Sequence, residues 1–261
     1  MKSCIALLVS CFMPLCCMAQ LPMATNSLTD ELLDVTSTLI VGTSIVNIWK
    51  DDAAVVAASF RRIEDRHPGR FILGVGAGHR EATQEYASPY QALATYVDKL
   101  LVHRVPAGSI VLAALGPRVL RLAGDRTAGA IPYLVPPEHT RRARELLGPE
   151  PLLAPEHKAV LDDDPARARK LGSRRVRNPY LGLVNYTSNL RRLGFTDEDL
   201  ADDGSERLID ALVAHGGPDE LAQQLSAHLA AGADHVCIQL LAEADADPMP
   251  GYRGVARALG L

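Results

Sequence analysis

Cysteine is nearly absent from most of the chain. Four of the five cysteines, Cys4, Cys11, Cys16 and Cys17, lie at the amino terminus, and only Cys237 occurs in the remaining sequence. A disulfide scaffold would distribute its cysteines through the domain, and a zinc knuckle would require C-x-x-C pairs, which this sequence does not contain. The body of the chain therefore has the composition of a reduced, intracellular protein, and we expect a cytoplasmic location.

An excess of positive charge is also missing. The sequence has 27 Lys and Arg against 31 Asp and Glu, a formal net charge of -4. A protein that binds nucleic acid or an anionic membrane surface usually carries a basic field, so we expect neither partner. The arginine-rich runs 141–144 and 174–177 are interpreted as solvated helix faces.

Only one hydrophobic stretch could suggest a membrane segment. It runs over residues 5–18 and is interrupted by Ser10 and Pro14, so it is too short for a confident transmembrane helix and resembles a secretory signal peptide. A non-native leader in front of a cytosolic domain is the alternative interpretation. We expect residues 1–25 to lie outside the fold and residues 26–261 to form one domain.

Several catalytic signatures are absent as well. The Pro-Glu-His triplets at 137–139 and 155–157 do not form H-E-x-x-H and are interpreted as polar starts of secondary-structure elements, so no metal is expected. No G-x-S-x-G elbow surrounds Ser44, which argues against a hydrolase nucleophile. The glycines at 74, 76 and 78 do not follow G-x-G-x-x-G, so a Rossmann dinucleotide site fits poorly.

The most informative stretch of the sequence is 39–78. Two apolar runs, 39–46 and 71–75, flank a segment over 52–66 with apolar residues at helical spacing, which predicts strand, helix, strand. Strands that are apolar almost throughout need cover on both faces, which favours parallel pairing with helical crossovers. Ligand sites of such folds gather at the carboxyl ends of the strands, here 44–47 and 76–79.

The same alternation continues along the chain. Strands are predicted near residues 40, 72, 111, 131, 155 and 238, with helices between most of them, while 178–216 shows helical pattern without an evident strand. Repeated strand–helix units over this length favour an α/β fold of the TIM-type (β/α)8 barrel over an open doubly wound sheet. The predicted barrel is two strands short.

Five motifs in order resemble one family. They are TSIVNIW at 43–49, RFILGVG at 70–76, ALGP at 114–117, PYLVPPEH at 132–139 and AGADHV at 231–236. Together they resemble the bacterial luciferase-like group, and within it the coenzyme F420-dependent oxidoreductases, over roughly 26–261. The resemblance implies a TIM-type barrel that lacks its first two strands, with a deazaflavin or flavin at the carboxyl ends of the strands.

The resemblance also implies a site and an activity. It places a non-prolyl cis peptide at Ser44-Ile45 and a cofactor cradle whose residues support the ring, orient it or hold its phosphate-bearing side chain. These cofactor-binding residues are Ser44, Ile45, Asn47, Gly76, Gly78, His79, Gly116 and Pro117. The implied reaction is hydride transfer between F420 and a small organic substrate, with no general acid or base identified.

Two alternatives stay open beside this interpretation. One is an FMN-dependent monooxygenase of the same fold. The other is a truncated, inactive paralogue, because the missing strands would leave a barrel with unpaired edges. The sequence leaves open whether the protein forms a homodimer.

Overall fold

The computed structural model describes residues 27–78, 88–243 and 246–261, and these form two compact units divided after Ile131. Each unit is described by itself. Among the described residues, no helix is long and apolar enough to cross a membrane.

The unit of residues 27–131 is built from parallel strands with helices between them. Its elements are α1 (Ser27–Asp34), β1 (Val41–Gly42), β2 (Val46–Asn47), α2 (Ala53–Arg66), β3 (Phe71–Gly76), α3 (Pro89–Val102), the 3-10 turn η3 (Ala107–Ser109), β4 (Ile110–Leu112), α4 (Pro117–Arg126) and β5 (Gly129–Ala130). Strand β3 is central, because β1 and β2 both pair with one of its edges and β4 with the other. Strand β5 continues the sheet beside β4.

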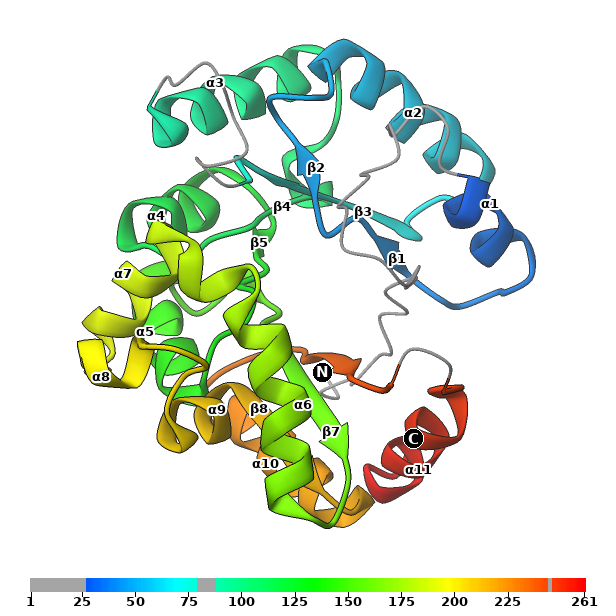
Figure 1. Ribbon diagram of the computed structural model, residues 1–261. Coiled ribbons are helices and arrows are strands. Elements are labelled where there is room, and N and C mark those ends of the chain that lie inside the picture. Colours follow the sequence, from blue (N-terminus) through cyan, green and yellow to red (C-terminus); the bar gives the residue numbers. More distant parts are fainter. Residues whose placement is uncertain (1–26, 79–87, 244–245) are drawn as a thin grey trace. The chain divides into compact units, whose positions relative to one another are not determined.

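Burial in this unit follows the apolar pattern. Five of the six β3 residues are buried, as expected for a strand covered on both faces. Helix α2 begins where the Asp52 carboxylate accepts a hydrogen bond from the Ala54 N–H (2.9 Å). Its buried face includes Phe60 and Ile63, and α2 packs beside α3 along the sheet (Figure 1). The predicted parallel α/β arrangement is confirmed.

The unit of residues 132–261 centres on strand β7. Its elements are α5 (Pro137–Leu147), β6 (Leu152–Leu153), β7 (Glu156–Leu161), α6 (Pro165–Arg177), η4 (Tyr180–Gly182), α7 (Val184–Arg192), α8 (Asp197–Leu200), α9 (Glu206–Leu212), β8 (Val213–Gly216), α10 (Pro218–Ala230), β9 (Cys237–Leu240) and α11 (Met249–Ala258). Strand β7 runs parallel to β8 on one side and to β9 on the other. Helices α6, α9 and α10 pack against these strands (Figure 1).

One face of β7 and β9 is apolar and packs against helices α10 and α11. Its buried residues form a single cluster: Ala159, Ala214, Leu221, Leu225, Ala233, Val236, Ile238, Leu240, Tyr252 and Val255. Because side chains alternate along a strand, Glu156, Lys158 and Gln239 lie on the opposite face.

Three sequence interpretations of this unit are corrected by the structure. The segment 178–216 contains strand β8, whose four residues, ending in glycine, are too few to show a strand pattern in the sequence. Glu156 and His157 do not cap an element, since both are buried inside β7. Arg144 is not on a solvated face, because its guanidinium donates to the carbonyl oxygens of Gly148, Pro151 and Gly232.

Candidate functional site

The carboxyl ends of β2, β3 and β4 form one edge of the first unit. Asn47 is paired in register with Gly76, and the Ile48 N–H donates to the Gly76 carbonyl (3.1 Å). On the other side of β3, the Ala113 N–H donates to the Val75 carbonyl (2.9 Å). The structure thus brings the predicted segments 44–47 and 76–78 together.

The peptide bond between Ser44 and Ile45 is cis, as the family resemblance implied. It lies between β1 and β2, two segments that both pair in parallel with the same neighbour, β3. Ser44 is exposed at this point, and Ile45 is half-buried.

Gly76 is buried and lies directly beside Ile45. A Cβ atom at Gly76 would lie 2.9 Å from the Ala113 Cβ and 3.0 Å from the Ile45 Cδ1. Both separations are shorter than normal contacts between carbon atoms. Glycine is therefore required here by the packing of Ile45 and Ala113 against the strand.

Asn47 presents a hydrogen-bond donor at the same edge. The residue is 7% exposed, and its Oδ1 accepts a hydrogen bond from the Trp49 N–H (2.9 Å), which fixes the orientation of the amide. The Nδ2 group faces the backbone of Gly78, where a Cβ would lie only 2.7 Å away, and Gly78 has a φ of 61°. Within the described residues, no group accepts a hydrogen bond from this Nδ2.

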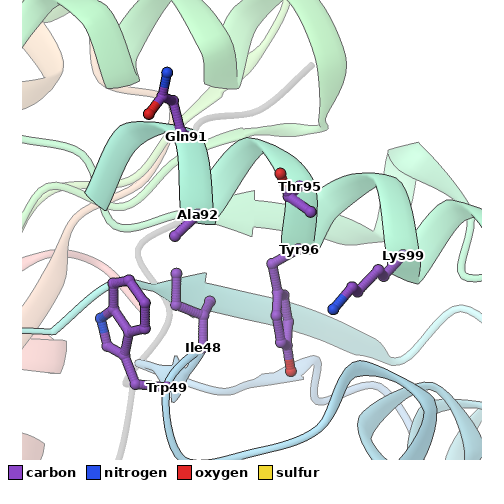
Figure 2. A pocket seen from close by; sticks show the side chains of 7 residues that line it. All are labelled: Ile48, Trp49, Gln91, Ala92, Thr95, Tyr96 and Lys99. Carbon is purple, nitrogen blue, oxygen red and sulfur yellow. The ribbon is translucent and has the colours of Figure 1, made fainter. Parts of the chain in front are cut away.

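Trp49 joins the two strand ends and lines an adjoining pocket. Its indole Nε1–H donates to the Ala77 carbonyl (2.7 Å). Figure 2 shows its ring and Ile48 facing helix α3 across a pocket of about 350 Å³. The lining residues are Ile48, Trp49, Gln91, Ala92, Thr95, Tyr96 and Lys99.

The pocket wall is held in place by a second hydrogen bond. The Tyr96 hydroxyl donates to the Asp51 carbonyl (2.9 Å), and burial raises the pKa of this phenol above its ordinary value. Tyr96 therefore stays neutral and serves as a fixed wall rather than as an acid or base.

Gly116 and Pro117 lie at the carboxyl side of β4. Gly116 is the N-cap residue of α4, with extended backbone, and Pro117 occupies the first turn of the helix. The start of a helix offers N–H groups and the positive end of its dipole, which suit an anion. His79, the remaining predicted site residue, lies outside the described residues.

The second unit contains a polar cluster that sequence reasoning missed. The Lys158 ammonium, 2% exposed, donates to the Tyr133 hydroxyl (2.8 Å), to Glu156 Oε1 (3.1 Å) and to Gln239 Oε1. The second oxygen of Glu156 accepts from the Leu134 N–H (2.9 Å). The only signal in the sequence was the run of three polar residues, Glu156, His157 and Lys158, directly in front of an apolar run.

Burial shifts the two proton-bearing groups of this cluster in opposite directions. It lowers the pKa of Lys158, with nearby Glu156 acting against the shift. It raises the pKa of the Tyr133 phenol well above the ordinary value, and the charge of Glu156 acts in the same sense. Tyr180 packs against Tyr133 with 5.6 Å between ring centroids, so the cluster has aromatic as well as polar walls.

The opposite face of β7 carries a second buried network, made of two histidines and a threonine. The Thr140 Oγ1 lies 2.7 Å from His228 Nδ1, and His228 Nε2 lies 2.9 Å from His157 Nδ1. The Val135 carbonyl lies 3.2 Å from the same His157 nitrogen. No group of His, Cys, Asp or Glu in the described part of the chain is arranged to hold a metal ion.

No protein-family model matches the chain, and a search of curated proteins finds no match. Solved structures do match. An F420-dependent secondary alcohol dehydrogenase in complex with an F420-acetone adduct has a TM-score of 0.66 and 16% identity over 91% of this chain and 87% of its own. The coenzyme F420-dependent tetrahydromethanopterin reductase of Methanopyrus kandleri has a TM-score of 0.59 and 15% identity over 82% and 80% of the two chains.

A third match is the oxygenating constituent of 3,6-diketocamphane monooxygenase from Pseudomonas putida, in complex with FMN. Its TM-score is 0.62, at 15% identity over 88% of this chain and 80% of its own. The fold is that of the luciferase-like oxidoreductases. The predicted α/β barrel class is therefore confirmed, and so is the resemblance at the level of the fold. These neighbours use either F420 or FMN.

Proposed function

We propose that this protein is an oxidoreductase that binds coenzyme F420 at the edge formed by the carboxyl ends of β2, β3 and β4. The observation that carries the proposal is the Asn47 Nδ2 donor, held in place by Trp49 and facing the Gly76–Gly78 backbone. The fold neighbours that use F420 support the choice of cofactor.

The residues at this edge fit a flat, largely uncharged ring. Half-buried Ile45, packed over Gly76, offers apolar support, and Asn47 offers one donor for a ring carbonyl. None of Ser44, Ile45, Asn47, Gly76 and Gly78 is charged, so the ring would meet no unpaired ion. The start of α4 at Gly116 and Pro117 would receive the phosphate of the side chain.

The bound deazaflavin would supply the chemistry by accepting or donating a hydride. The protein's part is to bind the ring, orient it through Asn47 and limit the access of water. The substrate is proposed to be a small organic molecule. FMN is the second candidate cofactor, because the diketocamphane monooxygenase of similar fold is described in complex with FMN.

The test is the substitution Asn47→Asp. A carboxylate oxygen can still accept from the Trp49 N–H, whereas the Nδ2 donor is lost, so the turn is kept and the contact to the ring is removed. Losing one such hydrogen bond should weaken cofactor binding by about tenfold. The binding is measured by the fluorescence of the cofactor itself. Asn185→Asp, an exposed position on α7, is the matched control. If Asn47→Asp binds F420 and FMN as tightly as Asn185→Asp does, Asn47 does not contact the cofactor.

A further inference from the structure

The pocket between the end of β2 and helix α3 shares no residue with the proposed cofactor edge. Its walls are Ile48 and Trp49 on one side and residues of α3 on the other, all within the unit of residues 27–131. Figure 2 shows Ala92, Tyr96 and Lys99 reaching from α3 to the side on which Ile48 and Trp49 lie. With about 350 Å³, the pocket is at the small end of the range of ligand sites, roughly 300–1,000 Å³.

Two aromatic rings give this pocket flat apolar walls. Tyr96 is 6% exposed, and its hydroxyl donates to the Asp51 carbonyl (2.9 Å), so the phenol ring is held in place. The Trp49 indole is held by its hydrogen bond to the Ala77 carbonyl (2.7 Å). Because these walls are already fixed, they lose little conformational entropy when a ligand binds, and their shape favours a flat, aromatic ligand.

Lys99 is the only charged residue among the seven that line the pocket. Its ammonium takes part in no ion pair within the described residues. Asp98, its neighbour in the sequence, pairs with Arg126 instead. The pocket therefore offers one uncompensated positive charge beside an apolar body, which suits a ligand that joins an apolar ring to an anionic group.

The charges around the pocket limit the ligand to a single negative charge. Burial, and after it the charges of Asp51 and Asp52, raise the pKa of Tyr96, so both carboxylates act on the hydroxyl end of this wall. A phosphate-bearing molecule would bring two or more negative charges to one ammonium group with two carboxylates in the neighbourhood, which is unfavourable. A single carboxylate, in contrast, is matched by Lys99 alone.

We propose that this pocket binds a small aromatic monocarboxylate, with its ring against Trp49 and Tyr96 and its carboxylate paired with Lys99. The site is separate from the cofactor edge, and its occupancy does not depend on the proposed function. Lys99 is exposed, so the ion pair should contribute only about fivefold to the affinity, while the apolar walls supply the rest.

The test uses the full chain, with benzoate, its neutral analogue benzamide and the non-aromatic cyclohexanecarboxylate as probes. Trp49 is the single tryptophan of the chain, so its indole N–H gives one cross-peak in a proton–nitrogen correlation spectrum, and a shift of this cross-peak reports a ligand bound beside it. Benzoate should shift the cross-peak of the parent protein. Benzamide should bind about fivefold more weakly, and cyclohexanecarboxylate should also bind more weakly than benzoate because it has no flat ring.

Two variants separate the charge from the apolar walls. Lys99→Gln should weaken benzoate binding about fivefold, to the level of benzamide, and leave benzamide binding unchanged. Its control is Lys170→Gln, at an exposed position on α6. Ala92→Leu fills the pocket and should abolish the shift caused by benzoate, whereas Ala58→Leu, at an exposed position on α2, should not.

A cross-peak that benzoate does not shift in the parent, or benzoate affinities that are equal in Lys99→Gln and the parent, would overturn the proposal. A loss of F420 affinity in Ala92→Leu would also overturn it, because the pocket would then belong to the cofactor site. A parent that binds benzoate in this pocket but binds neither F420 nor FMN would refute the proposed function alone.

Discussion

Acidification from pH 7 to pH 5 is expected to destabilise the unit of residues 132–261, because it holds two histidines in the neutral form. Burial lowers the pKa of His157 to about 4 and that of His228 to about 2, from an ordinary value of 6.5. Protonation therefore favours the unfolded chain. The stability from the neutral pair is present above about pH 6.5 and is lost as the pH falls towards 4.

The expected size of the effect follows from the same values. At pH 5 each of the two histidines binds a proton in the unfolded chain but not in the folded chain. This lowers the free energy of unfolding by about 2 kcal/mol per residue and about 4 kcal/mol for the pair. Typical domains have only about 5–15 kcal/mol of total stability, so the loss should be readily measured.

Hydrogen–deuterium exchange of the β7 and α10 amides at the two pH values reports the opening free energy of this unit. Substituting His228→Gln keeps a hydrogen-bonding side chain that does not titrate, so about half of the loss between pH 7 and pH 5 should disappear. Replacing the exposed His103 by Gln is the control and should leave the loss unchanged. Equal opening of the parent at both pH values, or a His228→Gln variant that loses as much stability as the parent, would show that the buried histidines do not cause the pH dependence.

Three further outcomes are expected from urea unfolding. Gly148→Ala should lower the free energy of unfolding by about 1 kcal/mol, because Gly148 has a φ of 90°. Gly108→Ala, the control, should leave it unchanged. A Cβ atom would meet no neighbour at either position, so equal losses would contradict an effect of backbone conformation. Lys158→Met should lower the free energy of unfolding by about 3–5 kcal/mol, because it leaves the buried Glu156 carboxylate without its ion-pair partner. The additional substitution Glu156→Gln should restore much of this stability. No recovery in the double variant would contradict a contribution of the ion pair. Gly76→Ala should cost about 1–3 kcal/mol through contact with Ala113 and Ile45, and an unchanged midpoint would show that the edge can relax.

Local patterns in the sequence were enough to predict most of the first unit, although the single strand predicted over 39–46 is divided into two short strands, β1 and β2. The two apolar runs are separated by a helix of ordinary length, so parallel topology predicted that their carboxyl ends lie at one edge of the sheet, where the structure pairs Asn47 with Gly76. The cis bond at Ser44-Ile45 came from the family resemblance and could not have been obtained from composition or periodicity.

The second unit was less predictable because its key contacts join distant positions. Glu156, His157 and Lys158 are three polar residues in a row, which in a sequence suggests exposure. Their burial depends on partners far along the chain, such as Tyr133, Gln239 and His228, and no local pattern announces such partners. Strand β8 was missed for a similar reason, since four residues become a strand only by pairing with β7.

The edge at Asn47, Gly76 and Gly78 is proposed to bind a deazaflavin or flavin ring. Trp49 is the single tryptophan of the chain, and it is hydrogen-bonded to Ala77 at this edge, so its fluorescence reports on a ligand bound there. Titrating the parent protein with F420, and separately with FMN, should quench Trp49 with one-to-one stoichiometry for at least one of the two cofactors. A tryptophan signal that neither cofactor changes, together with unaltered fluorescence of both cofactors, would show that this edge binds neither ring.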